Sequence, residues 1–135
     1  MGNLTNVVLT DRKATPVAHT FAPEGISPSG VATLIETTGV PVGNSRLSIS
    51  KNVTSGQSGR IKVVLKLAVP VVVNETINGV SSPKVVRTAY ADVTLTYDQT
   101  SSEAERNDFV GMLESAFKPA ATVINGTAVK LEGIW

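Results

Sequence analysis

The sequence predicts an α+β fold in which strands and helices occupy separate parts of the chain. Residues 4–97 repeatedly alternate apolar and polar side chains, which is typical of half-buried strands. Residues 102–131 instead carry apolar side chains at helical spacing. The length of 135 residues suits one domain and is too short for two ordinary ones. We therefore expect a single domain over residues 1–135, with an antiparallel sheet followed by two helices.

Six segments show the strand pattern, separated by turn-forming residues: 4–10, 17–21, 31–37, 46–51, 60–73 and 85–97. The first two should pair as a hairpin around the polar turn Asp11-Arg12-Lys13. Residues 22–30 are predicted to be a loop, 39–43 a break between strands, and 52–59 a Gly/Ser turn. Because these connections are short, the strands should follow one another as an antiparallel meander.

The connection between the two longest strands carries the strongest hairpin signal, an Asn-Gly pair at 78–79 between apolar residues. Pro83 should end this excursion because proline cannot donate to a strand ladder. We therefore predict a long, mobile tip over residues 74–82.

The helical part begins with Ser102-Glu103-Ala104-Glu105, which fits a capping box. An apolar stripe at helical spacing follows: Phe109, Met112, Leu113, Ala116 and Phe117. Pro119 should end this helix and can occupy the first turn of the next. Apolar residues between Ala120 and Leu131 predict that second helix, which Gly126 weakens.

One predicted strand places an aromatic ring and a carboxylate on its polar side. Between residues 87 and 97, Tyr90 and Asp92 stand among threonines, opposite Ala, Val and Leu residues. Two other strands repeat the pattern with hydroxyls and cations: Arg46, Ser48, Ser50, Arg60, Lys62 and Lys66. On a shared sheet, these side chains offer cations for phosphates, a ring for a base and an acceptor for base edges. That combination favours a single-stranded RNA site; the alternative is the ordinary solvated face of an antiparallel sheet.

Composition limits what the chain can do. Its net charge is only +1, so a role with nucleic acid requires the cations to gather on one face. Aromatic content is 4%, so the core must be built from Val, Ile, Leu and Ala. Such a core is small, and a one-sided sheet should need a partner chain to cover it.

The sequence predicts no enzyme, cofactor or metal site. The absence of cysteine removes disulfides, thiolate metal ligands and cysteine nucleophiles. The only histidine, His19, has no nucleophile motif to serve, so we interpret it as a surface or interface residue. Glu103 and Glu105 complement a helix dipole without catalysis. The Gly-rich segment 56–59 precedes a strand, whereas a phosphate-binding loop precedes a helix.

No membrane role is expected. The N-terminal residues lack the basic and apolar regions of a signal peptide, and the apolar run 69–73 is too short to span a bilayer. We expect a soluble protein, cytosolic where it is made.

Several strings resemble the coat proteins of single-stranded RNA bacteriophages, the leviviral family that includes Q-beta: Gly30-Val31-Ala32, Gly39-Val40-Pro41, Arg87 to Thr94, and Glu105-Arg106. The resemblance covers essentially the whole chain, including the tail 133–135. It implies an N-terminal hairpin, a five-stranded antiparallel sheet and two C-terminal helices. It also implies a ten-stranded sheet in an intertwined dimer, with each chain's helices packed over its partner.

The resemblance also implies an RNA-binding set: Arg46, Ser48, Ser50, Lys62, Val64, Lys66, Tyr90 and Asp92. Tyr90 matches a tyrosine that stacks on a loop base, Asp92 a base-contacting position, and Lys66 a phosphate- or base-contacting lysine. Ser48 and Ser50 match small hydroxyl residues of an adenine pocket, and Val64 stands where relatives have a more polar residue.

The function that follows is a capsid protein that assembles as dimers into an icosahedral shell around single-stranded genomic RNA. It should also bind an RNA hairpin and repress translation of the replicase. The predicted assembly loop contains Asn74, Ile77, Asn78, Gly79 and Pro83. We expect the protein in the virion, and in the bacterial host cytoplasm during assembly. The alternative is a cellular single-stranded nucleic-acid-binding protein that uses the same face; a small-ligand carrier or enzyme is disfavoured.

Overall fold

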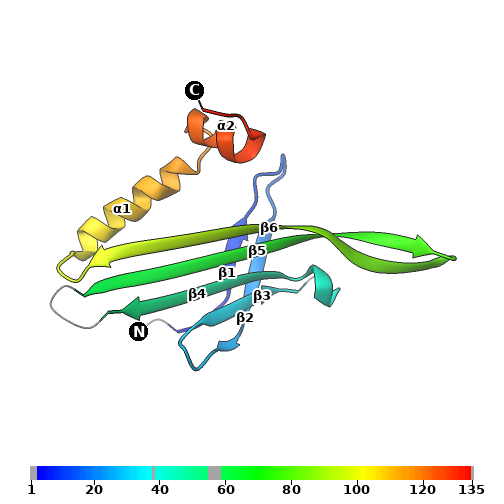
Figure 1. Ribbon diagram of the computed structural model, residues 1–135, viewed down its shortest axis with the longest axis horizontal. Coiled ribbons are helices and arrows are strands. Elements are labelled where there is room, and N and C mark those ends of the chain that lie inside the picture. The colour runs from blue at the N-terminus through cyan, green and yellow to red at the C-terminus, as the bar shows by residue number, and fades with distance from the viewer. Residues whose placement is uncertain (1–2, 38, 55–58, 135) are drawn as a thin grey trace. The chain divides into compact units, whose positions relative to one another are not determined.

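The alternating segments of the sequence form strands, and the helically spaced segments form helices (Figure 1). The computed structural model describes residues 3–37, 39–54 and 59–134. Two compact units divide the chain, residues 1–96 and 97–135, and each is described by itself. The strands are β1 (Val7–Thr10), β2 (Ala18–Ile26), β3 (Ala32–Glu36), β4 (Ser45–Val53), β5 (Arg60–Ile77) and β6 (Val80–Asp98). A 3-10 turn, η1 (Pro41–Gly43), lies between β3 and β4.

The strands form one six-stranded sheet in the order β1-β2-β3-β4-β5-β6, so each strand neighbours the next one along the chain. The predicted α+β class and meander are confirmed. The strand count is corrected. The prediction was an N-terminal hairpin and a separate five-stranded sheet, whereas the two strands of the hairpin, β1 and β2, belong to the six-stranded sheet. The dual pairing of β2 is the physical reason: residues 18–21 pair with β1, and residues 22–26 continue the strand to pair with β3. The prediction of a loop over 22–30 was therefore wrong for residues 22–26.

A bulge interrupts β2 where it pairs with β3. Pro23 stands opposite Leu34, and Gly25 stands opposite the next residue, Thr33, so Glu24 is the extra residue. Bulges bend a strand and redirect its side chains. This bulge lies at the edge of the face that carries the candidate site.

The core of the first unit is small. Its buried apolar side chains, among the described residues, are Phe21, Leu34 and Leu47. Leu34 pairs with Leu47 across β3 and β4, and Leu47 pairs with Leu67 across β4 and β5. These pairs place leucines of three adjacent strands on one face, as the period-two pattern predicts.

The end of the β5–β6 ribbon is a hairpin with a two-residue turn, which corrects the predicted length of the tip; its mobility stays a prediction. Asn78 and Gly79 both have positive φ angles, 51° and 80°, as a two-residue turn that matches the strand twist requires. Across the ribbon, the hydroxyls of Thr76 and Ser81 lie 3.0 Å apart. Pro83 does not end the strand because β6 is the last strand in the order, and a proline is tolerated on an edge strand.

The turn between β4 and β5 is described only in part. Strand β4 extends to Val53, so the first residues of the predicted turn 52–59 belong to the strand. Thr54 N donates to the carbonyl oxygen of Arg60 at 2.9 Å, which closes the two strands. Residues 55–58, and with them most of the Gly-rich segment, lie outside the described residues.

The second unit holds the helices α1 (Glu103–Ala116) and α2 (Thr122–Lys130). Ser102 is the N-cap of α1, and its hydroxyl accepts from Glu105 N at 3.2 Å, as the capping sequence predicts. Tyr97 and Phe109 pack edge to face, with ring centroids 5.8 Å apart. Pro119 lies in the turn before α2 and not in its first turn, because that helix begins at Thr122. None of the described helices is long and apolar enough to cross a membrane.

Candidate nucleic-acid interface

Strand pairing places the predicted RNA-binding residues of β4 and β5 on one face. Ser48 stands opposite Thr33 on one side and Lys66 on the other. Ser50 pairs with Val64, and Lys62 lies two residues further along the same face of β5. We call this surface the polar sheet face; its residues are Arg46, Ser48, Ser50, Lys62, Val64, Lys66, Tyr90 and Asp92.

A hollow of about 410 Å³ brings five of these eight residues together. Arg46, Ser48, Lys66, Tyr90 and Asp92 line it, together with Thr33, Leu67, Ala68 and Ala91. Ser50, Lys62 and Val64 are not among its lining residues. Thr33 is an addition that the sequence analysis missed, because only the β3–β4 register shows that its hydroxyl neighbours Ser48.

The side chains of the hollow differ in how freely they can meet a ligand. Tyr90 is 81% exposed, so its ring can stack on an incoming base. Lys66 is exposed and makes no ion pair with another described residue. Nη1 of Arg46 lies 3.7 Å from Oε2 of Glu24, the residue of the β2 bulge. The hollow therefore offers a ring, a carboxylate and two cations, one of which already has an anionic neighbour.

His19 lies between two carboxylates, away from this hollow. Its Nε2 donates to Asp11 Oδ2 at 2.8 Å, and its Nδ1 lies 2.8 Å from Glu36 Oε2. The latter oxygen is buried and has no hydrogen-bond partner among the described residues, so the contact is an ion pair. Asp11 first, and then Glu36, raise the pKa of His19 above its ordinary value. The backbone N–H of Val17 first, and then His19, hold the pKa of Asp11 well below its usual range.

The side chains around His19 support the fold and do not form a catalytic site. Asp11, His19 and Glu36 line a hollow of about 380 Å³ together with the apolar Leu9, Phe21, Leu67, Val69 and Pro70 and with Thr10, Gly43 and Ser45. In the described part of the chain the ring contacts Asp11 and Glu36, and no serine or threonine hydroxyl forms a hydrogen bond with it. His19, which the sequence indicated to be a surface or interface residue, is half-buried and ties the hairpin to β3.

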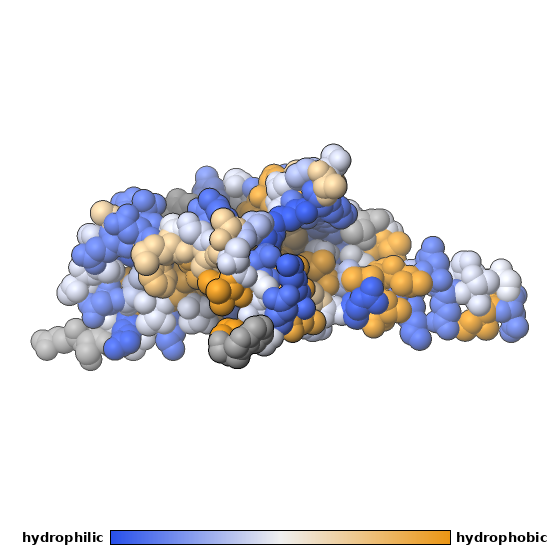
Figure 2. Space-filling view, turned by 90° about the horizontal axis from the view of Figure 1, so that it is seen from above, coloured by the Kyte–Doolittle hydropathy of each residue, from blue (hydrophilic) through white to orange (hydrophobic). Residues whose placement is uncertain are grey.

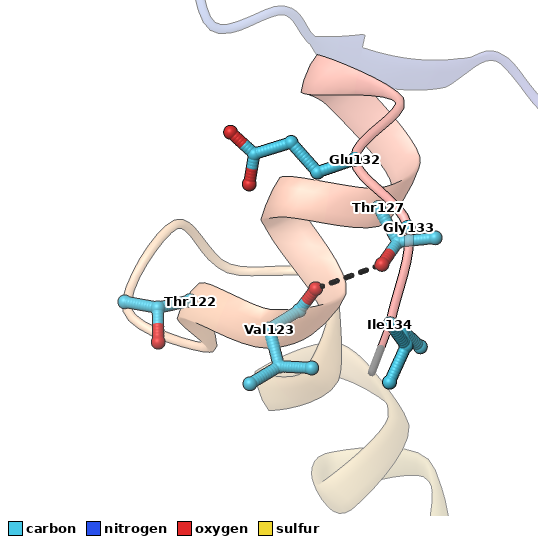
Figure 3. A pocket seen from close by; sticks show the side chains of 6 residues that line it. All are labelled: Thr122, Val123, Thr127, Glu132, Gly133 and Ile134. Atoms are coloured by element: carbon cyan, nitrogen blue, oxygen red, sulfur yellow. Dashed lines mark hydrogen bonds between the residues drawn. The ribbon is translucent and has the colours of Figure 1, made fainter.

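Another hollow, of about 280 Å³, lies in the second unit (Figure 3). Residues 132–134 turn back along α2, and Thr127 Oγ1 donates to the carbonyl oxygen of Val123 at 3.1 Å. Its one charged lining residue is Glu132, which repels phosphate. It is therefore a poor site for nucleic acid. Within the described residues, no cluster of His, Asp and Glu is arranged to hold a metal ion.

Comparisons with known proteins identify the family of the chain. The family model described as levivirus coat protein matches residues 2–135. The capsid protein of Pseudomonas phage PRR1 is 48% identical over 132 residues, which is 98% of each chain. The virus-like particle of bacteriophage ESE058 has the same fold, with a TM-score of 0.85, 22% identity, and coverage of 99% of this chain and 100% of that one. A structure described as an unassembled virus coat protein dimer and bacteriophage RNA-binding dimer has a TM-score of 0.62 at 22% identity, covering 98% of each chain. The chain therefore belongs to the levivirus coat protein family and is a capsid component of a bacteriophage, a structural protein and not an enzyme.

Proposed function

We propose that this coat protein binds single-stranded RNA through its polar sheet face while it assembles, as dimers, into an icosahedral shell around the genome. We further propose that the same face binds an RNA hairpin and so represses translation of the replicase. The observation that carries this proposal is the hollow that brings Tyr90, Asp92 and Lys66 together with Arg46 and Ser48.

The chemistry of the hollow suits an unpaired base and its flanking phosphates. An exposed tyrosine ring can stack on any base, and stacking contributes about 1–3 kcal/mol per base. Carboxylate and hydroxyl oxygens can read base edges, which are accessible when RNA bases are unstacked in a loop. Lysine and arginine neutralise phosphates, which adds affinity that depends little on sequence.

The dimer is proposed from the apolar surface that one chain leaves open. Helix α1 has no buried residue, and Phe109, Met112 and Phe117 are 47%, 73% and 56% exposed. Strand β6 ends the sheet order, so one of its edges has no neighbour in this chain. A second copy that pairs along this edge and exchanges helices would bury both surfaces. A structure of the same fold is described as a coat protein dimer that binds RNA, which supports a dimer.

RNA titrations of two variants test the RNA site. Tyr90→Ala is expected to form dimers and particles but to lose discrimination between two probes, a hairpin recovered from RNA that copurifies with the particles and its scrambled counterpart. Lys66→Ala should weaken the binding of both probes and lower the slope of log K against log salt concentration by about one. Filter binding at two salt concentrations measures both effects.

Lys118→Ala is the matched control, because Lys118 is a similarly exposed lysine on the helical unit. It should leave both probes unaffected. Unchanged discrimination in Tyr90→Ala would remove the stacking role. Light scattering of the wild type tests the shell: a megadalton particle is expected, and a small oligomer alone would favour a simple binding module.

A further inference from the structure

One acidic side chain stands against the polar sheet face. Glu24 Oε2 lies 3.7 Å from Arg46 Nη1, and the two side chains are 49% and 58% exposed. Arg46 lines the hollow that holds Lys66 and Tyr90. Glu24 is therefore close enough to compete with any phosphate that approaches Arg46.

The pairing of β2 with β3 places this carboxylate on the polar sheet face. Pro23 stands opposite Leu34, whose side chain is buried in the core, whereas Gly25 stands opposite Thr33, which lines the hollow. Glu24 is the extra residue at the point where β2 changes register. Because Glu24 follows Pro23, strand alternation directs its side chain away from the core, and the bulge adds Gly25 to the same face.

We infer that Glu24 limits the phosphate affinity of the proposed RNA site, and this inference rests on the function proposed above. Its carboxylate opposes phosphate at Arg46 and so lowers the part of the affinity that does not depend on sequence. Contacts to phosphate add affinity for every RNA, whereas contacts to bases distinguish one RNA from another. A group that weakens the first kind lowers the affinity for every RNA, whereas discrimination between RNAs is left to the base contacts.

A role in folding does not account for Glu24 equally well. The pair with Arg46 is solvent-exposed on both sides, and exposed ion pairs contribute little to stability. Removing the charge should therefore leave the fold and the dimer intact. A change in RNA affinity after substitution of Glu24 would then not arise from a change in folding.

The test compares Glu24→Gln with Glu75→Gln. Glu75 forms a similar exposed ion pair, 3.5 Å from Lys84 Nζ, at the end of the β5–β6 ribbon, and its loss changes the net charge equally. The probes are an unstructured oligouridylate and the hairpin recovered from packaged RNA. Glu24→Gln is expected to bind the oligouridylate about two- to fivefold tighter, the range that one exposed charge pair is worth. Its salt slope for that probe should steepen by about one phosphate contact. The hairpin should gain by a similar factor, because the released cation can meet a phosphate of either RNA.

The outcomes separate the two proposals. If the wild type binds neither probe with a salt-dependent affinity, the proposed RNA function fails. If the wild type binds both probes but Glu24→Gln behaves like Glu75→Gln, the role of Glu24 is overturned and the RNA site stands. A circular dichroism melt of each variant, expected to match the wild type, guards against a folding effect.

Discussion

The single histidine of the chain holds the hairpin turn to the end of β3. Asp11 comes from the turn after β1, His19 from β2 and Glu36 from β3, and both ring nitrogens lie 2.8 Å from a carboxylate oxygen. Lys13 Nζ is also near, 3.6 Å from Asp11 Oδ2. The contacts depend on pH, because only the protonated ring can donate an N–H to both carboxylates.

We predict that the stabilisation from His19 is lost at high pH. The folded pKa of His19 is raised above its ordinary value of 6.5, so its contribution is complete below that value and disappears as the pH rises through the folded pKa. Asp11 has the opposite sign: its pKa is lowered, so its contribution is present above its ordinary value of 3.8 and is lost in stronger acid. The melting temperature of the wild type should therefore fall on the alkaline side, whereas that of His19→Gln should not change with pH there.

NMR titration of the one imidazole measures the pKa directly, because no other histidine overlaps with it. Glu36→Gln is the partner variant, and it should lower the pKa of His19 while leaving the contact with Asp11. A wild-type pKa at or below 6.5 would contradict the bridge.

At the scale of elements, the β5–β6 ribbon leaves many apolar side chains in contact with water. Figure 2 shows apolar residues along its projecting end, and Val69, Val71, Val73, Ile77, Val80 and Val86 are each between 38% and 68% exposed. An apolar surface of this kind on a capsid protein suits contact with neighbouring subunits. The ribbon end, although its turn is short, therefore stays our predicted element of assembly.

We predict that replacing Asn78-Gly79 with Ala-Ala leaves dimers intact but reduces particle yield or mixes particle sizes. Both positions have positive φ, where alanine is strained by about 1–2 kcal/mol per residue. Size-exclusion chromatography measures the dimer and electron microscopy the particles. Gly30→Ala is the control, since Gly30 has a φ of 85° in a turn away from the ribbon. Particles of unchanged yield and size would show that the ribbon end does not control assembly.

The elements that the sequence could predict are those whose signals are local. The alternation around Tyr90 and Asp92 and the cap at Ser102 need only neighbouring residues, and both predictions are confirmed as a strand and a helix start. The partners of His19 and the pairing of Glu24 with Arg46 depend on which strands meet and in which register. The ribbon end was misjudged because Pro83 breaks central strands but is tolerated on an edge.

At the scale of the whole molecule, one chain buries little. Phe21, Leu34 and Leu47 are its buried apolar side chains in the described ranges, while most apolar residues of the helices remain exposed. The aromatic content of 4% limits what a single-chain core can contain, as the composition predicts. The partner that covers this surface is not predictable from hydrophobic spacing alone, because spacing identifies an apolar face and not its occupant.

We predict that folding and dimerisation are coupled, so that the melting temperature rises with protein concentration. Met112→Asp should weaken the dimer strongly, because burying a methionine side chain contributes about 1.5–3 kcal/mol and a buried unpaired charge costs more. Met112→Leu is the conservative control and should retain the dimer. Sedimentation measures the dimer, and thermal melts at several protein concentrations measure its coupling to folding. A well-folded monomer at micromolar concentration, with concentration-independent melting, would contradict the coupling.

The small single-chain core also has a consequence for behaviour in the cold. If most apolar surface is buried only when chains meet, most of the heat-capacity change belongs to association and not to the folding of one chain. Hydrophobic stabilisation weakens on cooling. Contacts between dimers that depend on the exposed valines of β5 should then loosen at low temperature, before the dimers themselves, whose folding is coupled to association, come apart.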